Sequence, residues 1–297
     1  MCLIPPPQLS KFPFVSLGAT AWIFRIDEFT VVKFARTTGS SDFVRENAFF
    51  DELKHHAPSP HVIQSFYRTQ DAIFLPFLAG GSLENRLRNN QIRDSGKFVR
   101  VKRIEPVELL KAWTMELTAG SAWIESLGYV HGDLRPGNLL LDAEDHLKLT
   151  DFGWANKIGT PASGNGAPWA RLLGPETGAD EGTWGLNGPQ TEQFAIGSIV
   201  YCMTRGREPF EGEIEDGRTQ VEMFQNMNFP ELHHDQLDYI IRKCWHGEFG
   251  SLQELAIAAK TIHSIRPTAT ALSVAICRER KEVCQRLVGE GLLSSDI

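Results

Sequence analysis

Three oxygen-bearing side chains, Asp133, Asn138 and Asp151, stand in the sequence at a spacing that suits phosphoryl transfer. Asn138 lies five residues after Asp133, and Asp151 lies thirteen residues after Asn138. Mg²⁺ prefers hard oxygen ligands and usually shares them with the phosphates of a substrate. An aspartate that receives a hydroxyl proton, beside an asparagine and an aspartate that hold metal, is an arrangement that transfers phosphoryl groups. The spacing therefore predicts that these three side chains reach one point.

A short hairpin is expected to position Asn138 and Asp151. Residues 139–141 are all leucine, a charged turn follows, and residues 147–149 alternate leucine with lysine. Apolar runs on both sides of a polar turn are typical of two paired strands. The two side chains would then lie in the loops just before and just after this hairpin.

The whole chain divides into a β-rich part and a helical part. Strands are expected at 22–26, 30–35, 62–67 and 72–77, and helices at 43–55, 83–89, 106–127 and 271–287. We therefore predict an α+β protein with one domain (14–272), made of an N-lobe (14–77), a hinge (76–81) and a C-lobe (82–272), between a flexible N-terminal segment (1–13) and a C-terminal helix and tail (273–297). The basic, polar stretch 90–104 is interpreted as a surface insertion. The last helix is expected to dock on the larger lobe or to contact a partner.

Composition argues against several kinds of partner and compartment. The 297 residues carry a formal net charge of −7, which argues against nucleic acid or an anionic membrane as the main partner. The first residues lack the charged and apolar regions of a signal peptide, and no run approaches the about 20 apolar residues that cross a bilayer. Five cysteines without paired spacing suit reduced thiols: Cys2, Cys202, Cys244, Cys277 and Cys284. We expect an intracellular protein, cytoplasmic or nuclear, that is a monomer.

The run 131–138, His-Gly-Asp-Leu-Arg-Pro-Gly-Asn, followed by Asp-Phe-Gly at 151–153, resembles the catalytic and metal-binding loops of the protein kinase family. The resemblance extends over residues 14–266. In overall style, the sequence is similar to divergent kinase-like proteins of filamentous fungi. It implies a two-lobed protein-kinase-like fold. It also implies ATP- and Mg²⁺-dependent transfer of the γ-phosphate to a protein hydroxyl, of serine or threonine rather than tyrosine.

The resemblance implies a role for each polar residue of the two loops. Asp133 would orient the acceptor hydroxyl and accept its proton, while Asn138 and Asp151 would ligate Mg²⁺. Arg135 would balance the charge of the transferring phosphate, because a guanidinium fork suits phosphate oxygens. Phe152 would pack under the helix of the N-lobe.

In the N-lobe, Lys33 resembles the lysine of the family's third strand, which binds the α- and β-phosphates and pairs with a helix carboxylate. Glu46 is the expected carboxylate, with Glu52 as the alternative. The further nucleotide contacts that the resemblance implies are Gly18, the one glycine retained from the family's loop, Ile23 at the place of the family's valine, and Leu75, Pro76 and Leu78 at the hinge.

Several positions depart from the family pattern or need a partner further along the chain. Gly132 replaces the arginine that usually receives a phosphorylated activation segment, and Trp169 stands where serine/threonine kinases carry a threonine. Glu192 replaces an aspartate that normally holds the backbone of the catalytic loop. Glu176 closes the activation segment, and its expected ion-pair partner is Arg266.

These departures leave two alternatives open. One is a pseudokinase that binds nucleotide or acts as a scaffold. The other is a small-molecule phosphotransferase on the same fold, because the run 131–138 is also close to the catalytic loop of aminoglycoside and choline-type kinases. The Asp-Phe-Gly and Gly-Pro-Glu motifs and Arg266 favour a protein kinase over this second alternative.

Overall fold

A computed structural model describes residues 4–164, 166–233 and 235–294, so Cys2 lies outside the described residues. The chain forms two compact units. The first draws on three parts of the sequence, Met1–Ala79, Asp151–Trp154 and Thr270–Ile297, and the second comprises Gly80–Thr150 and Ala155–Ala269. The chain first passes from one unit to the other between Ala79 and Gly80, within the predicted hinge.

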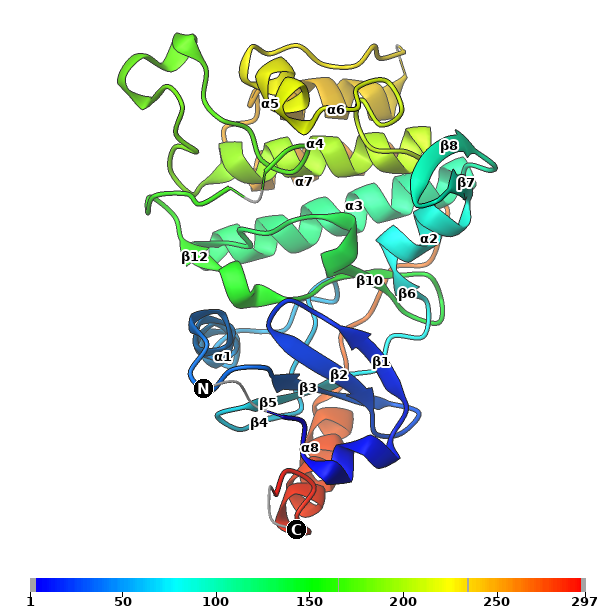
Figure 1. The fold of residues 1–297 in the computed structure, drawn as a ribbon, viewed down its shortest axis with the longest axis vertical. Coiled ribbons are helices and arrows are strands. Elements are labelled where there is room, and N and C mark those ends of the chain that lie inside the picture. The colour runs from blue at the N-terminus through cyan, green and yellow to red at the C-terminus, as the bar shows by residue number, and fades with distance from the viewer. Residues whose placement is uncertain (1–3, 165, 234, 295–297) are drawn as a thin grey trace. The chain divides into compact units, whose positions relative to one another are not determined.

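The first unit is built on a five-stranded antiparallel sheet with the strand order β1-β2-β3-β5-β4 (Figure 1). Its elements are η1 (Pro7–Lys11), β1 (Phe14–Leu17), β2 (Ala21–Arg25), β3 (Thr30–Ala35), α1 (Ser41–Leu53), β4 (Tyr67–Arg68), β5 (Ala72–Pro76), η3 (Phe152–Trp154) and α8 (Val274–Gly289). The strand expected at 62–67 is wrong, because only Tyr67 of that stretch belongs to a strand. Val62, Ile63 and Phe66 are buried from a loop instead, and a short apolar run does not distinguish the two cases.

The two faces of this sheet carry different kinds of side chain. Phe24, Val32 and Phe74 are direct neighbours across three strands, so their side chains share one face and join one apolar core. Successive residues of a strand point to opposite faces. Lys33 therefore lies on the other face of the sheet.

The face that carries Phe24 is covered by both ends of the chain, η1 and α8. Leu9 and Cys284 are fully buried in the same apolar core. Arg280 of α8 also donates a hydrogen bond of 3.4 Å to Asp27. The predicted flexible segment 1–13 is therefore corrected in its described part, because Leu9 is a core residue. The last helix is corrected as well, since it belongs to the first unit and not to the larger lobe.

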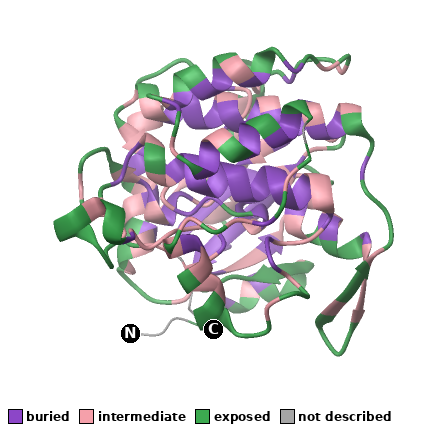
Figure 2. Ribbon diagram, turned by 90° about the horizontal axis from the view of Figure 1, so that it is seen from above, coloured by how far each residue is buried: buried purple, intermediate pink, exposed green. Residues whose placement is uncertain are grey.

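The second unit is mostly helical. Its helices are α2 (Leu83–Asn89), α3 (Val107–Ser126), α4 (Pro189–Arg205), α5 (Gly217–Gln225), α6 (Gln236–Trp245) and α7 (Leu252–Lys260). The long helices α3 and α4 are largely buried (Figure 2). Ser82 caps α2 as predicted, since its hydroxyl accepts a 3.1 Å hydrogen bond from Asn85 N. Gly206 ends α4 at a φ of +67°, a conformation that glycine adopts without strain.

Short strands and 3₁₀ turns connect these helices. They are β6 (Gly81–Ser82), β7 (Gln91–Asp94), β8 (Lys97–Val101), β9 (Tyr129–Val130), η2 (Pro136–Asn138), β10 (Leu139–Leu141), β11 (Leu147–Leu149), β12 (Asn156–Lys157) and η4 (Pro175–Asp180). The predicted hairpin after Asn138 is confirmed, because β10 and β11 pair in antiparallel fashion with Leu139 opposite Leu149. The stretch interpreted as a surface insertion contains a second hairpin, β7–β8. Of the described helices, none has the length and apolar character needed to cross a membrane.

Candidate active site

In the first unit, Lys33 is the centre of a group of three charged side chains. Its Nζ lies 2.6 Å from Glu46 Oε2 on α1 and 2.9 Å from Asp151 Oδ1. Lys33 and Glu46 are almost fully buried, while the side chain of Asp151 is 42% exposed. The predicted pair of Lys33 with Glu46 is thus present. The alternative, Glu52, instead contacts His56 at 3.1 Å on the outside of the helix.

These carboxylates keep the buried lysine charged. Burial alone would lower the pKa of Lys33, but the charges of Glu46 and Asp151 outweigh it and raise that pKa above the ordinary value. Lys33 is therefore an ammonium at any physiological pH. An ammonium on this face of the sheet can bind an anion such as a phosphate.

Asp151 has an unusual backbone conformation that the neighbouring residues hold in place. Its φ is +66°, a region that non-glycine residues rarely occupy and that is often found at functional sites. Phe152 anchors the segment, with its ring centroid 4.8 Å from that of Phe49 and 5.6 Å from that of Phe50, both on α1. The predicted packing of Phe152 under this helix is confirmed. It fixes the direction of the Asp151 carboxylate relative to Lys33.

The other predicted nucleotide contacts also lie in the first unit. Ile23 is the direct neighbour of Lys33 on β2, and Leu75 lies on β5 opposite Val31. Both share the face of Lys33, because residues opposite each other, or two apart on one strand, do so. Pro76 is the last residue of β5, and Leu78 follows two residues later, half-buried.

Gly18 lies between β1 and β2, and its loop is held by a residue that the sequence did not single out. The guanidinium of Arg36 donates hydrogen bonds to the carbonyls of Gly18, at 3.3 Å, and Ala19, at 3.1 Å. A Cβ at Gly18 would meet only the carbonyl of Ala21, at an ordinary 3.5 Å. The local fold therefore tolerates a side chain there, and close approach to phosphate remains the predicted reason for this glycine. In the sequence, the only indication that Arg36 supports this loop was its position directly after the strand predicted at 30–35.

In the second unit, Asp133 is positioned by two side chains of its own loop. Asn138 Nδ2 donates hydrogen bonds of 2.8 Å to both the backbone carbonyl and Oδ2 of Asp133. Arg135 Nε lies 3.3 Å from Asp133 Oδ1. Since both partners of the Asn138 amide are acceptors, its nitrogen must face them, which directs Oδ1 elsewhere as a possible metal ligand. The loop thus brings together three of the predicted site residues.

The backbone of this loop is held by His131 and Glu192. The carboxylate of Glu192 accepts hydrogen bonds from the backbone N–H groups of His131, at 2.9 Å, and Gly132, at 3.1 Å. His131 Nδ1 accepts from Asp133 N, and its Nε2 faces the carbonyl oxygen of Thr150 at 3.0 Å. These partners require a neutral imidazole with the proton on Nε2. Glu192 therefore does what the resemblance implies for the family's aspartate.

Glu192 is nearly completely buried, and this changes its acidity. Burial raises the pKa of Glu192 to about 7; the two backbone N–H groups act in the opposite direction, and the negative charge of Asp133 raises it further. The proton on this carboxyl is therefore sensitive to pH near neutrality.

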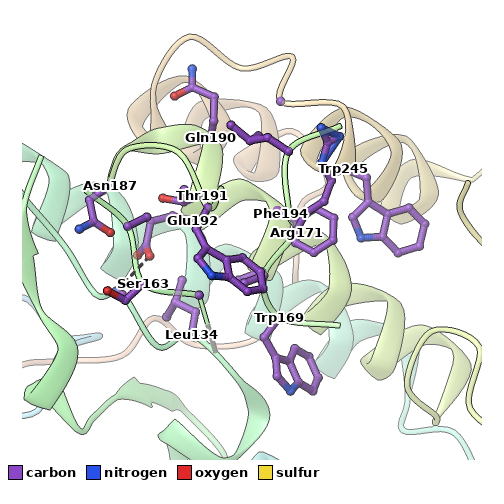
Figure 3. Close-up of a pocket in the computed structure, with 18 of the residues that line it drawn as sticks. Leu134, Ser163, Trp169, Arg171, Asn187, Gln190, Thr191, Glu192, Phe194 and Trp245 are labelled. Carbon is purple, nitrogen blue, oxygen red and sulfur yellow. Dashed lines mark hydrogen bonds between the residues drawn. The ribbon is translucent and has the colours of Figure 1, made fainter. Parts of the chain in front are cut away.

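A cavity of about 320 Å³ begins at the catalytic loop of the second unit. Its lining includes Asp133 and Leu134 of that loop and four aromatic side chains, Trp169, Trp184, Phe194 and Trp245. Figure 3 labels Leu134, Trp169, Phe194 and Trp245 among them. Trp169 lines this cavity from the segment that precedes Glu176. These aromatic side chains give the cavity an apolar lining, as is usual for ligand pockets.

One predicted ion pair is wrong. Glu176 pairs with Arg171, not with Arg266. Arg266 Nη2 instead donates a hydrogen bond to the carbonyl oxygen of Glu144. Arg171 lies five residues before Glu176, so holding these two side chains together closes a much shorter loop of chain.

The described residues offer few side chains that could ligate a metal ion together. Within the described parts of the chain, no group of three or more His, Cys, Asp or Glu side chains is arranged to hold a metal ion. The two predicted oxygen ligands, Asp151 and Asn138, belong to different units. Their meeting at one ion stays a prediction, and Mg²⁺ would take further ligands from phosphate and water.

Comparison with known proteins identifies one family. The model of the protein kinase domain matches residues 26–278. Rho-associated protein kinase 1 of Homo sapiens is 30% identical over 175 residues, which cover 56% of this chain and 12% of that protein. The cAMP-dependent protein kinase catalytic subunit PRKX of Mus musculus is 29% identical over 206 residues (65% and 49%), and a cAMP-dependent protein kinase catalytic subunit of Arthrobotrys oligospora is 27% identical over 209 (66% and 33%). The chain spans less than half the length of each of these relatives.

Proposed function

Because the chain belongs to the protein kinase family, we propose that it transfers the γ-phosphate of ATP, with Mg²⁺, to a serine or threonine hydroxyl of a protein. The β-rich first unit and the helical second unit correspond to the two lobes of the kinase fold. Arg135 keeps a positive charge at the place where many serine/threonine kinases carry lysine, so the charge balance proposed for the transferred phosphate is retained. The described cysteines are free thiols, which supports an intracellular setting as part of the proposal.

The observation that carries the proposal is the buried group of Lys33, Glu46 and Asp151. A scaffold that does not bind nucleotide has no need to bury an ammonium between two carboxylates, because buried ions lose more hydration than their attraction returns unless the geometry is good. In this group Lys33 is charged and Asp151 is partly exposed. Such a group is suited to receive a phosphate on Lys33 and a divalent ion on Asp151.

The residues of the catalytic loop support the chemical step. Asp133 is fixed by Asn138 and lies next to the positive charge of Arg135, so it can orient a hydroxyl and take its proton as the new oxygen–phosphorus bond forms. Arg135, whose side chain is 46% exposed, can approach the negative charge of the transferred phosphoryl group. When bound, Mg-ATP would supply the phosphoryl group and leave as Mg-ADP after the bond to the β-phosphate oxygen breaks.

The donor set fits a magnesium nucleotide. Asp151 and Asn138 offer one carboxylate and one amide oxygen, which are the hard ligands that Mg²⁺ takes. Lys33 offers a point charge for the α- and β-phosphates. Ile23 and Leu75 provide apolar surface on the same face of the sheet as Lys33, and this surface suits a purine base.

The deciding experiment measures transfer of labelled γ-phosphate from Mg-ATP to a mixed protein substrate, for the natural chain and for Asp133→Asn. We expect transfer by the natural chain and a loss in the variant of roughly a hundredfold to ten-thousandfold, the range of general-base effects. Binding of Mg-ADP, measured by calorimetry, should change little in the variant, because Asp133 acts on the acceptor.

Two results would contradict the proposal. Transfer to small alcohols but to no protein would favour the small-molecule phosphotransferase. Absence of all transfer, together with a rise in the melting temperature upon addition of Mg-ATP, would favour the pseudokinase, since a ligand that binds only the folded state stabilises it.

A further inference from the structure

The β7–β8 hairpin, residues 91–101, is a feature of the second unit that the catalytic proposal does not use. It follows α2 directly, and Figure 1 shows it at the edge of that unit. Its turn has positive φ at both Ser95, +50°, and Gly96, +82°. Such a turn matches the twist of a two-residue hairpin loop. The stretch is therefore a defined hairpin.

A β-bulge decides which side chains of the hairpin face the protein. Arg93 lies opposite Phe98, but Ile92 lies opposite Arg100, so Val99 is an extra residue on β8. The bulge shifts the alternation of β8 by one residue. As a result Phe98 and the later Val101 both lie on the face of Arg93, while Arg100 lies on the opposite face.

The inner face of the hairpin is fixed to the helical core. Gln91 Nε2 donates a 2.6 Å hydrogen bond to the carbonyl oxygen of Gly206, and Arg93 forms an ion pair with Glu211. Phe98 packs closely against Gly212, and Val101 packs closely against Gly206, so neither glycine position has room for a side chain. A Cβ at Gly212 would lie 2.9 Å from Phe98, and one at Gly206 would lie 2.9 Å from Val101. Glycines at 206 and 212 therefore allow the hairpin to be seated on this surface.

The outer side of the hairpin carries exposed positive charge next to an apolar side chain. Lys97, Arg100 and Lys102 are all exposed. None of the three forms an ion pair with another residue that the structure describes, whereas Arg93 on the inner face does. Val99, the bulged residue, is 53% exposed between them. Asp94, which lies opposite Lys97 in the strand register, is the one exposed carboxylate of the two strands. The hairpin thus presents to solvent three cations with a single acidic neighbour, beside one apolar side chain.

We propose that this outer side binds a short acidic segment of a partner protein, with carboxylates against Lys97, Arg100 and Lys102 and an apolar side chain against Val99. Charge complementarity favours such an occupant, because carboxylates are attracted to cations that form no ion pair with another described residue, and the hairpin holds three of them within six residues. A long polyanion or a bilayer surface is disfavoured. Either would extend beyond these three cations over the surface of a chain whose net charge is −7.

The test measures binding of a fluorescent peptide of alternating glutamate and leucine residues to the full chain by anisotropy. We expect binding that weakens as the salt concentration rises, since screening reduces attraction between exposed charges. The triple variant Lys97→Glu, Arg100→Glu, Lys102→Glu should bind at least roughly tenfold more weakly, while a peptide of glutamine and leucine should not bind.

A matched control reverses three exposed basic residues of α8: Arg278→Glu, Lys281→Glu and Arg286→Glu. It changes the net charge by the same amount and should keep the affinity of the natural chain. Equal losses in both triple variants would overturn the proposal, because the effect would then come from net charge alone. If the charge-reversed hairpin does not fold, the glutamine versions of the same three positions replace it, with a smaller loss expected.

Two competing occupants are included as outcomes. Vesicles with anionic lipid and a single-stranded oligonucleotide are tested against the same variants. Tighter binding of either than of the peptide, lost in the hairpin variant, would overturn the acidic segment as occupant, as would absence of peptide binding. None of these measurements depends on phosphate transfer, so the proposed kinase activity is tested separately.

Discussion

The partner of Lys33 decides how well the buried ammonium is held. Glu46 and Glu52 lie on the same helix, but only Glu46 reaches Lys33, whereas Glu52 contacts His56 at the surface. Glu46→Gln should lower the free energy of unfolding by about 1 to 3 kcal/mol, because a buried charge loses one of its two ionic partners. It should also reduce phosphate transfer at least roughly tenfold. Urea denaturation and labelled transfer measure the two effects.

Glu52→Gln is the matched control for this prediction. It makes the same chemical change on the same helix, where the side chain is partly exposed, and a surface ion pair contributes little. Equal effects of the two variants on transfer would remove Glu46 from the site.

A pH dependence of stability follows from Glu192. The unfolded chain releases this proton near the ordinary value of 4.5, but the folded protein holds it until the pKa of about 7. The folded state therefore binds more protons between these values, and the free energy of unfolding falls as the pH rises from about 5 to about 7, by up to about 3 kcal/mol.

Glu192→Gln should remove this part of the pH dependence. An amide does not titrate, and it accepts only through its single oxygen, so one of the hydrogen bonds from His131 and Gly132 is lost as well. Chemical denaturation at several pH values compares the slopes. Parallel curves for the variant and the natural chain would assign the pH dependence to other groups.

Sequence predicted side-chain partners well where the backbone elements left few choices. Lys33 with Glu46 and Glu192 with the loop of Asp133 follow from residues that the resemblance places on fixed elements. Glu176 with Arg266 failed, because Glu176 lies in an irregular segment where a nearer arginine competes. The sequence pattern alone does not indicate which of two arginines will pair with a given glutamate.

At the level of elements, the loop at Gly18 is held by a side chain from outside the loop. Arg36 binds the carbonyls of Gly18 and Ala19, and its guanidinium lies 5.9 Å from the ring of Trp22. Arg36→Ala should leave the fold intact but release this loop. We expect an affinity for Mg-ADP that is weaker by roughly fivefold, equivalent to about 1 kcal/mol, for the loss of partly exposed hydrogen bonds.

Calorimetry of Mg-ADP binding and hydrogen exchange of residues 17–20 would measure this effect. Lys54→Ala removes an exposed ion pair with Asp51 in the same unit and serves as the control. An unchanged affinity in Arg36→Ala would show that the position of the loop does not depend on this side chain.

The sequence predicted one hairpin of the second unit better than the other. The β10–β11 hairpin has apolar strands on both sides of a polar turn, and its existence was predicted. The β7–β8 hairpin has a bulge and depends on Gly206 and Gly212, more than a hundred positions along the chain. Its strands are polar because only one face is packed, so local pattern indicated no more than a surface insertion.

On the scale of the molecule, the first unit is completed by residues from both ends of the described chain. Leu9 from η1 and Cys284 from α8 are fully buried against the sheet that carries Lys33. A core made from distant parts of the sequence is weakened when any one of them is removed, because each close-packed side chain depends on its neighbours. The catalytic loop of the second unit rests on a different core, in which α3 and α4 are buried.

Leu9→Ala should therefore destabilise one unit more than the other. A leucine truncated in a core costs about 2 to 5 kcal/mol. Hydrogen exchange, resolved by peptide, should become faster in β2, β3 and β5, while α3 and α4 keep their protection, because compact units open separately. Leu17→Ala is the control in the same unit, since this leucine is 57% exposed and its loss should change stability little. If exchange rose equally in both units, the two cores would unfold as one, and the ends of the chain would support the entire molecule.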